Sequence, residues 1–257
     1  RSSSTSASGP ATRRPNATVG SVALGSTAAR VPASQDGATA GPYGEAVDRP
    51  SREFLDHPGP IPFAHRGGAG DWPENTMPAF AGAVALGFRY VETDAHVTAD
   101  GVVLAFHDDR LDRVTDRCGV VAEMTWSDVR RARVDGVEPI VLLEDLLTTW
   151  PDLRVNIDPK HDAVVAPLAQ LLRRTGTVQR VCIGSFSDAR IQHMRDLLGP
   201  RLCTSLGPRA VAALRLGSLG LGRRRPDGSC VQVPVKVRRI PIVDDRFVRT
   251  AHTLDLP

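Results

Sequence analysis

The sequence is poor in aromatic residues, which make up 5% of the 257 residues and include only two tyrosines. A surface that stacks nucleic-acid bases needs aromatic side chains interleaved with basic ones. Such a basic stretch is missing, although the chain carries a net charge of +3. The one tight basic run, at 223–225, is interpreted as a solvated loop. We therefore expect no nucleic-acid partner.

Long apolar runs and paired cysteines are also missing. No run approaches the roughly 20 residues of a membrane span, and no basic start followed by an apolar segment is visible. The cysteines form no C-x-x-C pair, which argues against a disulfide framework. Two of them lie inside apolar runs, so buried free thiols and a reducing, cytoplasmic location are expected. The four cysteines are Cys118, Cys182, Cys203 and Cys230.

The first 53 residues are rich in Ser, Ala, Gly, Thr and Pro and show little hydrophobic periodicity. A segment of this kind cannot bury enough apolar surface to offset the entropy lost on ordering. We expect residues 1–53 to be disordered and residues 54–257 to form the folded domain. The overall composition, 41% hydrophobic and 24% charged, is enough for one sizeable core.

From residue 54 onward, short apolar runs alternate with helical patterns. The residues Asn75 and Thr76 offer a helix cap, and Pro78 is allowed in a first turn. A turn signal at 98–101 separates two predicted strands. Strands are predicted at 88–94, 102–106, 153–158, 181–184, 202–205 and 230–233, and helices at 79–86, 142–150, 163–174, 188–198, 209–216 and 244–253.

This alternation predicts right-handed crossovers and a parallel sheet, which could be a closed barrel or an open doubly wound sheet. Polar residues at the carboxyl ends of strands favour the barrel. A (β/α)8 barrel usually takes about 250 residues, and the predicted folded part is shorter. The prediction is an α/β fold of the TIM-barrel type that is incomplete at its C-terminus. The oligomeric state is left open.

Three carboxylates follow apolar strands and could bind a hard cation. Glu92 and Asp94 are two residues apart, so they share one face of a strand, where a divalent ion would relieve their repulsion. Asp158 ends another strand, and Lys160 beside it offers a positive charge to a phosphate. Two exposed strand carboxylates and an ordinary Asp-Pro turn explain the same residues and stay open as alternatives.

Two histidines, His65 and His107, directly follow apolar runs. Histidines in such places are often hydrogen-bonded packing residues, but they can also transfer protons. Arg66 follows His65 immediately, and its guanidinium suits bidentate binding of a phosphodiester. The glycines that come next would let the backbone approach a ligand. These residues indicate metal-assisted phosphoryl chemistry.

The order of these motifs resembles the glycerophosphodiester phosphodiesterase family. The match over residues 61–117 comprises five blocks, and weaker similarity continues to the end of the folded part. The blocks are Phe63-Ala64-His65-Arg66-Gly67-Gly68, Pro73-Glu74-Asn75-Thr76, Glu92-Thr93-Asp94, Thr98-Ala99-Asp100-Gly101 and His107-Asp108.

The resemblance implies a TIM-barrel hydrolase that converts glycerophosphodiesters such as glycerophosphocholine to sn-glycerol 3-phosphate and an alcohol. By the family pattern, His65 and His107 are the general acid/base pair and Arg66 clamps the phosphate. The family's Mg²⁺ or Ca²⁺ would be bound by Glu92, Asp94 and a third carboxylate. That third position carries Asp158, where the family usually has Glu.

The family's final strand, with its Trp-Thr-Val-Asn sequence, has no counterpart in this chain. Two alternatives are therefore kept beside the glycerophosphodiesterase. One is a related barrel phospholipase D or lyase that acts on lysophospholipids. The other is a non-catalytic fragment that keeps the site residues without turnover.

Overall fold

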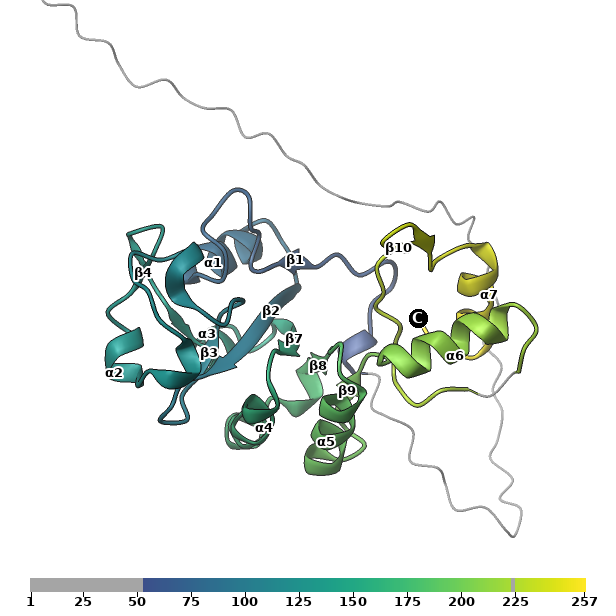
Figure 1. Cartoon of the computed structure of the whole chain (residues 1–257). Helices are drawn as coiled ribbons and strands as arrows, with labels where there is room; N and C mark the ends of the chain where they lie inside the picture. Colours follow the sequence, from purple (N-terminus) through teal and green to yellow (C-terminus); the bar gives the residue numbers. More distant parts are fainter. Residues whose placement is uncertain (1–52, 223–224) are drawn as a thin grey trace, which may run out of the picture. The chain divides into compact units, whose positions relative to one another are not determined.

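The computed structural model describes residues 53–222 and 225–257 (Figure 1). The predicted disordered segment lies outside the described residues except for its last residue. Most of the basic run at 223–225 lies outside them as well. Among the described residues, no helix is both long and apolar enough to cross a membrane.

The main sheet contains seven strands, in the order β6-β3-β2-β7-β8-β9, and β1 also pairs with β2. β1 and β3 share one edge of β2: β1 pairs with its first half in parallel, and β3 pairs with its second half in the antiparallel sense. The seven strands are β1 (Ala64–His65), β2 (Tyr90–Val97), β3 (Val103–Ala105), β6 (Val141–Leu142), β7 (Arg154–Pro159), β8 (Val181–Ile183) and β9 (Cys203–Thr204).

The sheet is mixed, whereas the alternating pattern predicted a parallel one. β3 runs antiparallel to both β2 and β6. The reason is the tight turn at 98–101, since a parallel partner would need a much longer crossover. From β2 through β7 and β8 to β9 the strands are parallel, as predicted. Two small hairpins lie outside the sheet: β4 (Arg133–Val134) with β5 (Glu138–Pro139), and β10 (Lys236–Val237) with β11 (Ile240–Pro241).

The helices that follow the strands lie close to the predicted positions. The side chain of Thr76 caps the first helix by accepting a hydrogen bond from the Ala79 N–H (3.3 Å), and Pro78 lies in the first turn. Both features were predicted. The α-helices are α1 (Met77–Ala85), α2 (Trp126–Val129), α3 (Leu143–Thr149), α4 (Asp162–Thr175), α5 (Asp188–Leu198), α6 (Pro208–Ser218) and α7 (Asp245–Thr253).

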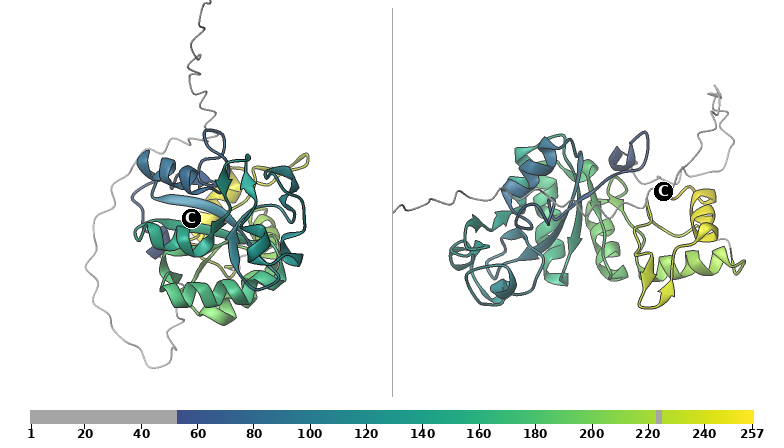
Figure 2. Two further views of the ribbon diagram at one scale, coloured as in Figure 1. Left: turned by 90° about the vertical axis from the view of Figure 1, so that its left-hand side faces the viewer. Right: turned by 90° about the horizontal axis from the view of Figure 1, so that it is seen from above.

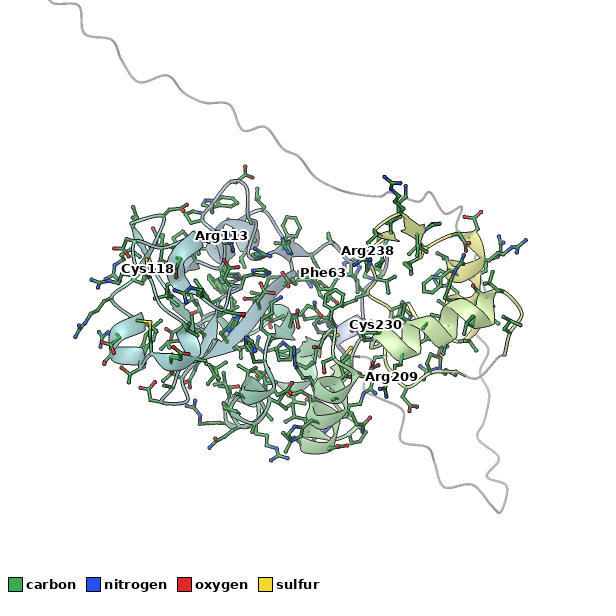
Figure 3. The ribbon with its side chains drawn as sticks, viewed as in Figure 1. Phe63, Arg113, Cys118, Arg209, Cys230 and Arg238 are labelled. Carbon is green, nitrogen blue, oxygen red and sulfur yellow. The ribbon has the colours of Figure 1, made fainter. Side chains whose placement is uncertain are left out.

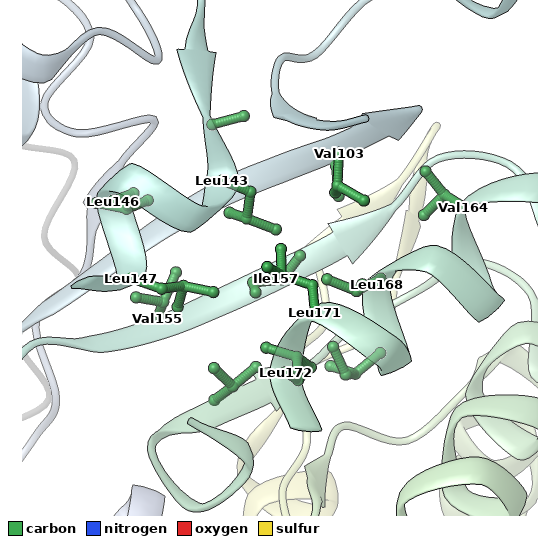
Figure 4. Packing of buried hydrophobic residues seen from close by; sticks show 14 of the residues in the cluster. Val103, Leu143, Leu146, Leu147, Val155, Ile157, Val164, Leu168, Leu171 and Leu172 are labelled. Atoms are coloured by element: carbon green, nitrogen blue, oxygen red, sulfur yellow. The ribbon is translucent and has the colours of Figure 1, made fainter. Parts of the chain in front are cut away.

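The main hydrophobic core lies between the sheet and helices α1, α3, α4 and α5, whose arrangement is seen in Figures 1 and 2. Figure 4 shows Val155 and Ile157 of β7 in contact with leucines of α3 and α4. The α4 sequence places its apolar residues at helical spacing, so Leu168 and Leu172 share the face that is buried. This packing fixes β2 and β7 side by side.

Side chains alternate between the two faces of β2 and β7. The odd-numbered Val91, Ala95, Val155 and Ile157 pack into the main core. The even-numbered residues point to the opposite face, because successive strand side chains alternate. Those on β2 are Tyr90, Glu92 and Asp94, and those on β7 are Arg154, Asn156 and Asp158. The predicted metal ligands therefore share this second face, which points away from the main core and is the interior face of the sheet.

The segment between β3 and β6 has a small hydrophobic core of its own. It is built around Leu104, Phe106, Leu111 and Val134, and it includes α2 and the β4–β5 hairpin. The segment begins immediately after β3, and its first residues are therefore placed at the end of that strand. His107 is one of them.

The C-terminal part contains α6 and α7, which pack together around Leu214 and Phe247. The predicted strand at 230–233 is reduced to one parallel bridge between Ser205 and Cys230. The next residue, Val231, donates its N–H to the Pro257 carbonyl (2.8 Å) and not to a strand of the sheet. Among the described residues, the hydrogen-bonded order β6 to β9 does not close into a ring.

Candidate active site

The end of β1 brings His65 and Arg66 to the carboxyl end of the sheet. The register pairs His65 with Glu92, and the two side chains lie 3.7 Å apart (Nε2 to Oε2). The backbone of Arg66 is left-handed (φ 50°), and its N–H donates to Glu92 Oε2 (3.2 Å). Gly67 follows with φ 79°, and a Cβ there would come within 2.8 Å of the Phe80 ring. The glycine therefore allows the turn to pack on α1.

All three predicted carboxylate ligands are held in a poorly hydrated place. Burial, and then the neighbouring charge of Asp94, raise the pKa of Glu92 to about 7. Burial also raises the pKa of Asp158. Asp94 is 2% exposed. Buried carboxylates are costly to keep charged unless cations compensate for them.

Two cations face this group of carboxylates. Lys160 Nζ lies 2.6 Å from Asp94 Oδ1 and 2.9 Å from Asp158 Oδ2. Burial opposes its charge, but the bonds to both carboxylates raise the pKa of the lysine. Arg66 approaches from the other side, with Nε 3.5 Å from Asp94 Oδ2. The predicted phosphate-binding lysine and arginine thus flank the same aspartate.

His107 belongs to a chain of charged groups that sequence reasoning did not identify. Its Nδ1 lies 2.5 Å from Asp108 Oδ1. Arg113 Nε donates to Asp108 Oδ2 (2.5 Å), and its Nη2 donates to Glu74 Oε1 (2.6 Å). Glu74 also accepts a hydrogen bond from Arg66 Nη1 (3.0 Å). The network joins the His107 loop to the Arg66 turn.

The hydrogen bonds of this network lower the pKa values of its two carboxylates. The Arg113 hydrogen bond lowers the pKa of Asp108 to about 2, although burial opposes the shift. Burial also opposes ionisation of Glu74, but hydrogen bonds and charge from Arg113 and Arg66 lower the pKa of its carboxyl. Both carboxylates are therefore ionised at neutral pH. Asp108 can accept the Nδ1–H of His107 and leave Nε2 available for proton transfer.

His65 has a different environment. Burial first, and then the charge of Arg66, lower the pKa of its imidazole. The ring is therefore neutral at neutral pH and able to accept a proton. The side chain is 66% exposed, so a ligand can reach it.

A second histidine cluster lies beside these residues. His96 is 1% exposed, and its Nε2 is 3.0 Å from the His107 carbonyl oxygen. His161 Nε2 is 2.8 Å from Asp109 Oδ1. The His96 nitrogen that faces Asp109 is Nε2, the atom already in contact with the His107 carbonyl. Because that nitrogen is used in this contact, we interpret His96 as a structural residue.

The donor set fits a hard divalent cation. Glu92, Asp94 and Asp158 supply carboxylate oxygens, which Mg²⁺ and Ca²⁺ prefer. Asp94 Oδ2 is buried without a hydrogen-bond partner among the described residues, and such an oxygen is suited to a metal. The ligand oxygens of these three carboxylates do not all lie within 4.8 Å of one another. Lys160 lies between two of them.

The structure brings all seven predicted site residues to one end of the sheet. They are His65, Arg66, Glu92, Asp94, His107, Asp158 and Lys160. Sequence reasoning assigned no role to Asp108, Glu74 or Arg113. Asp108 lies next to His107 in the last motif, and Glu74 lies in the block at 73–76. Arg113 carried no signal, because its partner Glu74 is 39 residues away.

Comparison with known proteins identifies the family. The sequence pattern of the glycerophosphoryl diester phosphodiesterase family matches residues 65–256. The chain belongs to this family. It is therefore a phosphodiesterase-family hydrolase by class, as predicted, and a relative from Mycobacterium tuberculosis supports the assignment. That protein, named "Probable glycerophosphodiester phosphodiesterase 2", is 41% identical over 209 residues, which are 79% of each chain.

Two further family members are informative. The crystal structure of a glycerophosphodiester phosphodiesterase from Agrobacterium tumefaciens matches with a TM-score of 0.60 and 25% identity. It covers 76% of this chain and 83% of that one, and it confirms the predicted α/β barrel class. A human lysophospholipase D is 30% identical over 126 residues, which are 43% of this chain and 40% of that protein.

Proposed function

We propose that this glycerophosphoryl diester phosphodiesterase family member hydrolyses glycerophosphodiesters to sn-glycerol 3-phosphate and an alcohol. The observation that carries the proposal is the convergence of two histidines and two cations on one group of buried carboxylates. Arg66 Nε and Lys160 Nζ both approach Asp94. Positive charge and imidazoles at one place are what phosphoryl transfer needs.

A divalent cation, Mg²⁺ or Ca²⁺, is part of the proposal. Glu92, Asp94 and Asp158 would bind it, and Asp94 Oδ2, which is buried and accepts no hydrogen bond from the described residues, supports this assignment. When bound, the ion supplies positive charge that stabilises the phosphoryl oxygens in the transition state. Asp158 has a shorter side chain than the family's usual Glu, so it would either move the ion or admit a water beside it.

The protein's own residues would do the rest of the chemistry. Arg66 holds the non-bridging phosphate oxygens, and Lys160 adds a second positive charge near them. A hydroxyl or water oxygen attacks phosphorus, and the bond from phosphorus to the alcohol oxygen breaks. One imidazole of the His65 and His107 pair takes the proton of the attacking group, and the other donates a proton to the leaving alcohol.

The test is release of glycerol 3-phosphate from glycerophosphocholine by the 257-residue chain. The assay is run with Mg²⁺, with Ca²⁺ and with an added chelator. We expect release that the chelator stops and that either or both cations restore. Folded protein that binds the cation but releases no product would contradict the proposal and favour a non-catalytic chain.

A lysophospholipase D is the second candidate, because a human relative carries that name. The same purified chain is given lysophosphatidylcholine in a parallel assay. A product that keeps the acyl chain, either as a phosphate monoester or as a cyclic phosphate, would favour this candidate. Faster release of glycerol 3-phosphate from glycerophosphocholine would favour the first.

A further inference from the structure

Three cysteines from distant parts of the sequence meet on the interior face of the sheet. Cys182 on β8 is the register partner of Cys203 on β9, and Cys230 continues the sheet beyond β9 through the Ser205 bridge. All three are buried free thiols, and their sulphur atoms lie within 4.8 Å of one another. The Cys182 and Cys230 sulphurs are 3.9 Å apart.

We propose that Cys182, Cys203 and Cys230 form a binding site for one Cu⁺ ion. Thiolates are soft ligands that select Cu⁺ and similar ions over Mg²⁺ or Ca²⁺. Metal–sulphur bonds are about 2.3 Å long, so three sulphurs in a plane around one ion lie about 4 Å apart. The 3.9 Å between the Cys182 and Cys230 sulphurs matches this spacing.

The number of ligands points to Cu⁺ rather than Zn²⁺. Structural zinc sites are almost always closed by four protein ligands. Among the described residues, the cluster contains three cysteines and no fourth His, Cys, Asp or Glu. Two uncharged polar side chains adjoin the thiols: Ser229 hydrogen-bonds Cys203, and the Gln232 amide nitrogen is 4.0 Å from the Cys182 sulphur. An amide nitrogen donates a hydrogen bond and does not bind a metal ion.

The surroundings are apolar, with arginines at their border. Phe54, Phe63 and Tyr90 pack with the cysteines. Binding Cu⁺ releases the thiol protons to solvent and leaves an anionic site, which needs compensating charge nearby. Arg154 donates to the Tyr90 hydroxyl (2.5 Å), and Arg195 donates to Thr204, the neighbour of Cys203 on β9 (2.7 Å). Of the two, Arg195 is close enough to Cys182 for their charges to interact.

The thiol site is separate from the carboxylate site. Cys182 is the register partner of Asn156, which precedes Asp158 by two residues on the same face of β7. The thiols therefore lie one register row below Asp94 and Asp158, in the row of Glu92, and Asn156 stands between Cys182 and Glu92. A Cu⁺ ion there would connect β8, β9 and the Cys230 segment, so its role would be structural.

The fourth cysteine gives a matched control. Cys118 is exposed and lies in a different part of the molecule from Cys230 (Figure 3). The full chain is titrated with Cu⁺ without oxygen, against a coloured Cu⁺ chelator that competes for the ion. We expect one tightly bound Cu⁺ per chain in the wild type and in Cys118→Ala. We expect binding to fall at least tenfold in each of Cys182→Ala, Cys203→Ala and Cys230→Ala.

Because the thiols are buried, Cu⁺ is also added during refolding from denaturant, and X-ray absorption is recorded on the product. A first shell of three sulphurs is the expected result, together with a higher melting temperature than the metal-free protein. Circular dichroism of each alanine variant shows whether it is folded, and a variant that is not folded is replaced by the corresponding Cys→Ser. Absence of tight Cu⁺ binding by the refolded wild type would overturn the proposal. Equal binding by a folded triple variant, or a Cys182–Cys230 disulfide in freshly purified protein, would do the same.

Discussion

Nδ1 of His107 lies 2.5 Å from Oδ1 of Asp108, the residue that follows it in the chain. Asp108 is fixed in turn by Arg113, which also binds Glu74 next to the Arg66 turn. The imidazole is thus oriented by its neighbour, and the neighbour is oriented by a cation from the same loop. Four predictions follow from this network and from the contacts of Lys160 and Asp244.

Replacing His107 tests the proposed proton transfer. We expect His107→Ala to lower kcat by about 10²- to 10⁴-fold, the usual contribution of a positioned acid or base. Affinity for Mg²⁺ or Ca²⁺, measured by calorimetry, should stay close to that of the wild type. His193→Ala is the control, because His193 is exposed on α5. Turnover near the wild-type rate in His107→Ala would show that this imidazole does not transfer the proton.

Replacing Arg113 tests positioning. In Arg113→Gln, the links to Asp108 and Glu74 are lost, and the orientation of His107 is no longer fixed. We expect kcat to fall about 10- to 100-fold, as misplaced catalytic groups do, while KM changes less than threefold. Arg113→Lys should recover part of the activity. Arg110→Gln is the matched control, since among the described residues Arg110 forms its ion pair with nearby Asp112. A change confined to KM would instead indicate that Arg113 binds substrate.

Replacing Lys160 tests the electrostatics of the carboxylates. The Lys160 ammonium lies between Asp94 and Asp158 and contacts both. We expect Lys160→Met to lower the melting temperature by several degrees, since about 1 kcal/mol corresponds to roughly 2–4 °C in a protein of this size. Saturating Mg²⁺ or Ca²⁺ should then raise the melting temperature more than in the wild type. Lys236→Met, on the exposed β10, is the control. An equal metal-induced rise in both proteins would count against the carboxylate site.

The pH dependence of α7 follows from Asp244. Its side chain caps the helix by accepting the Phe247 N–H (2.9 Å), and it pairs with Arg215 of α6 (2.8 Å). The Arg215 bond, and then the Phe247 bond, lower its pKa from 3.8 to about 2. A lowered carboxyl pKa stabilises the folded state above pH 3.8, and the contribution is lost as the pH falls from 3.8 toward 2.

Asp244→Asn keeps a good capping residue and removes the charge. We expect it to melt below the wild type at pH 6, and we expect the difference to shrink as the pH falls toward 2. Asp245→Asn, one residue further along, is the control. A difference in melting temperature that is the same at both pH values would show that the ion pair does not contribute.

Features that depend on neighbouring residues were predictable from the sequence. The start of α1 was predicted because Thr76 and Pro78 act within one helical turn. Glu92 and Asp94 were placed on one face because strand geometry alone requires it. The HRG, ETD and HD motifs supplied five of the seven site residues and the 158–160 segment supplied the other two, and the structure brings all seven to one end of the sheet.

Features that depend on distant partners were not predictable. Arg113 binds Glu74 across 39 positions, and the three cysteines that meet are separated by 21 and 27 positions. No local pattern marks such pairs. The strand predicted at 230–233 makes a single bridge, because apolar residues favour a strand only where a neighbouring strand can pair with them.

The small separate core between β3 and β6 has a consequence for how activity fails on heating. His107, Asp108 and Arg113 are held by that core, whereas Glu92, Asp94 and Asp158 are held by the larger one under α3 and α4. Segments with few buried contacts open before the whole protein unfolds. Inactivation on heating would then begin reversibly, by loosening of the His107 loop, at temperatures where the strands and the carboxylate group are still intact.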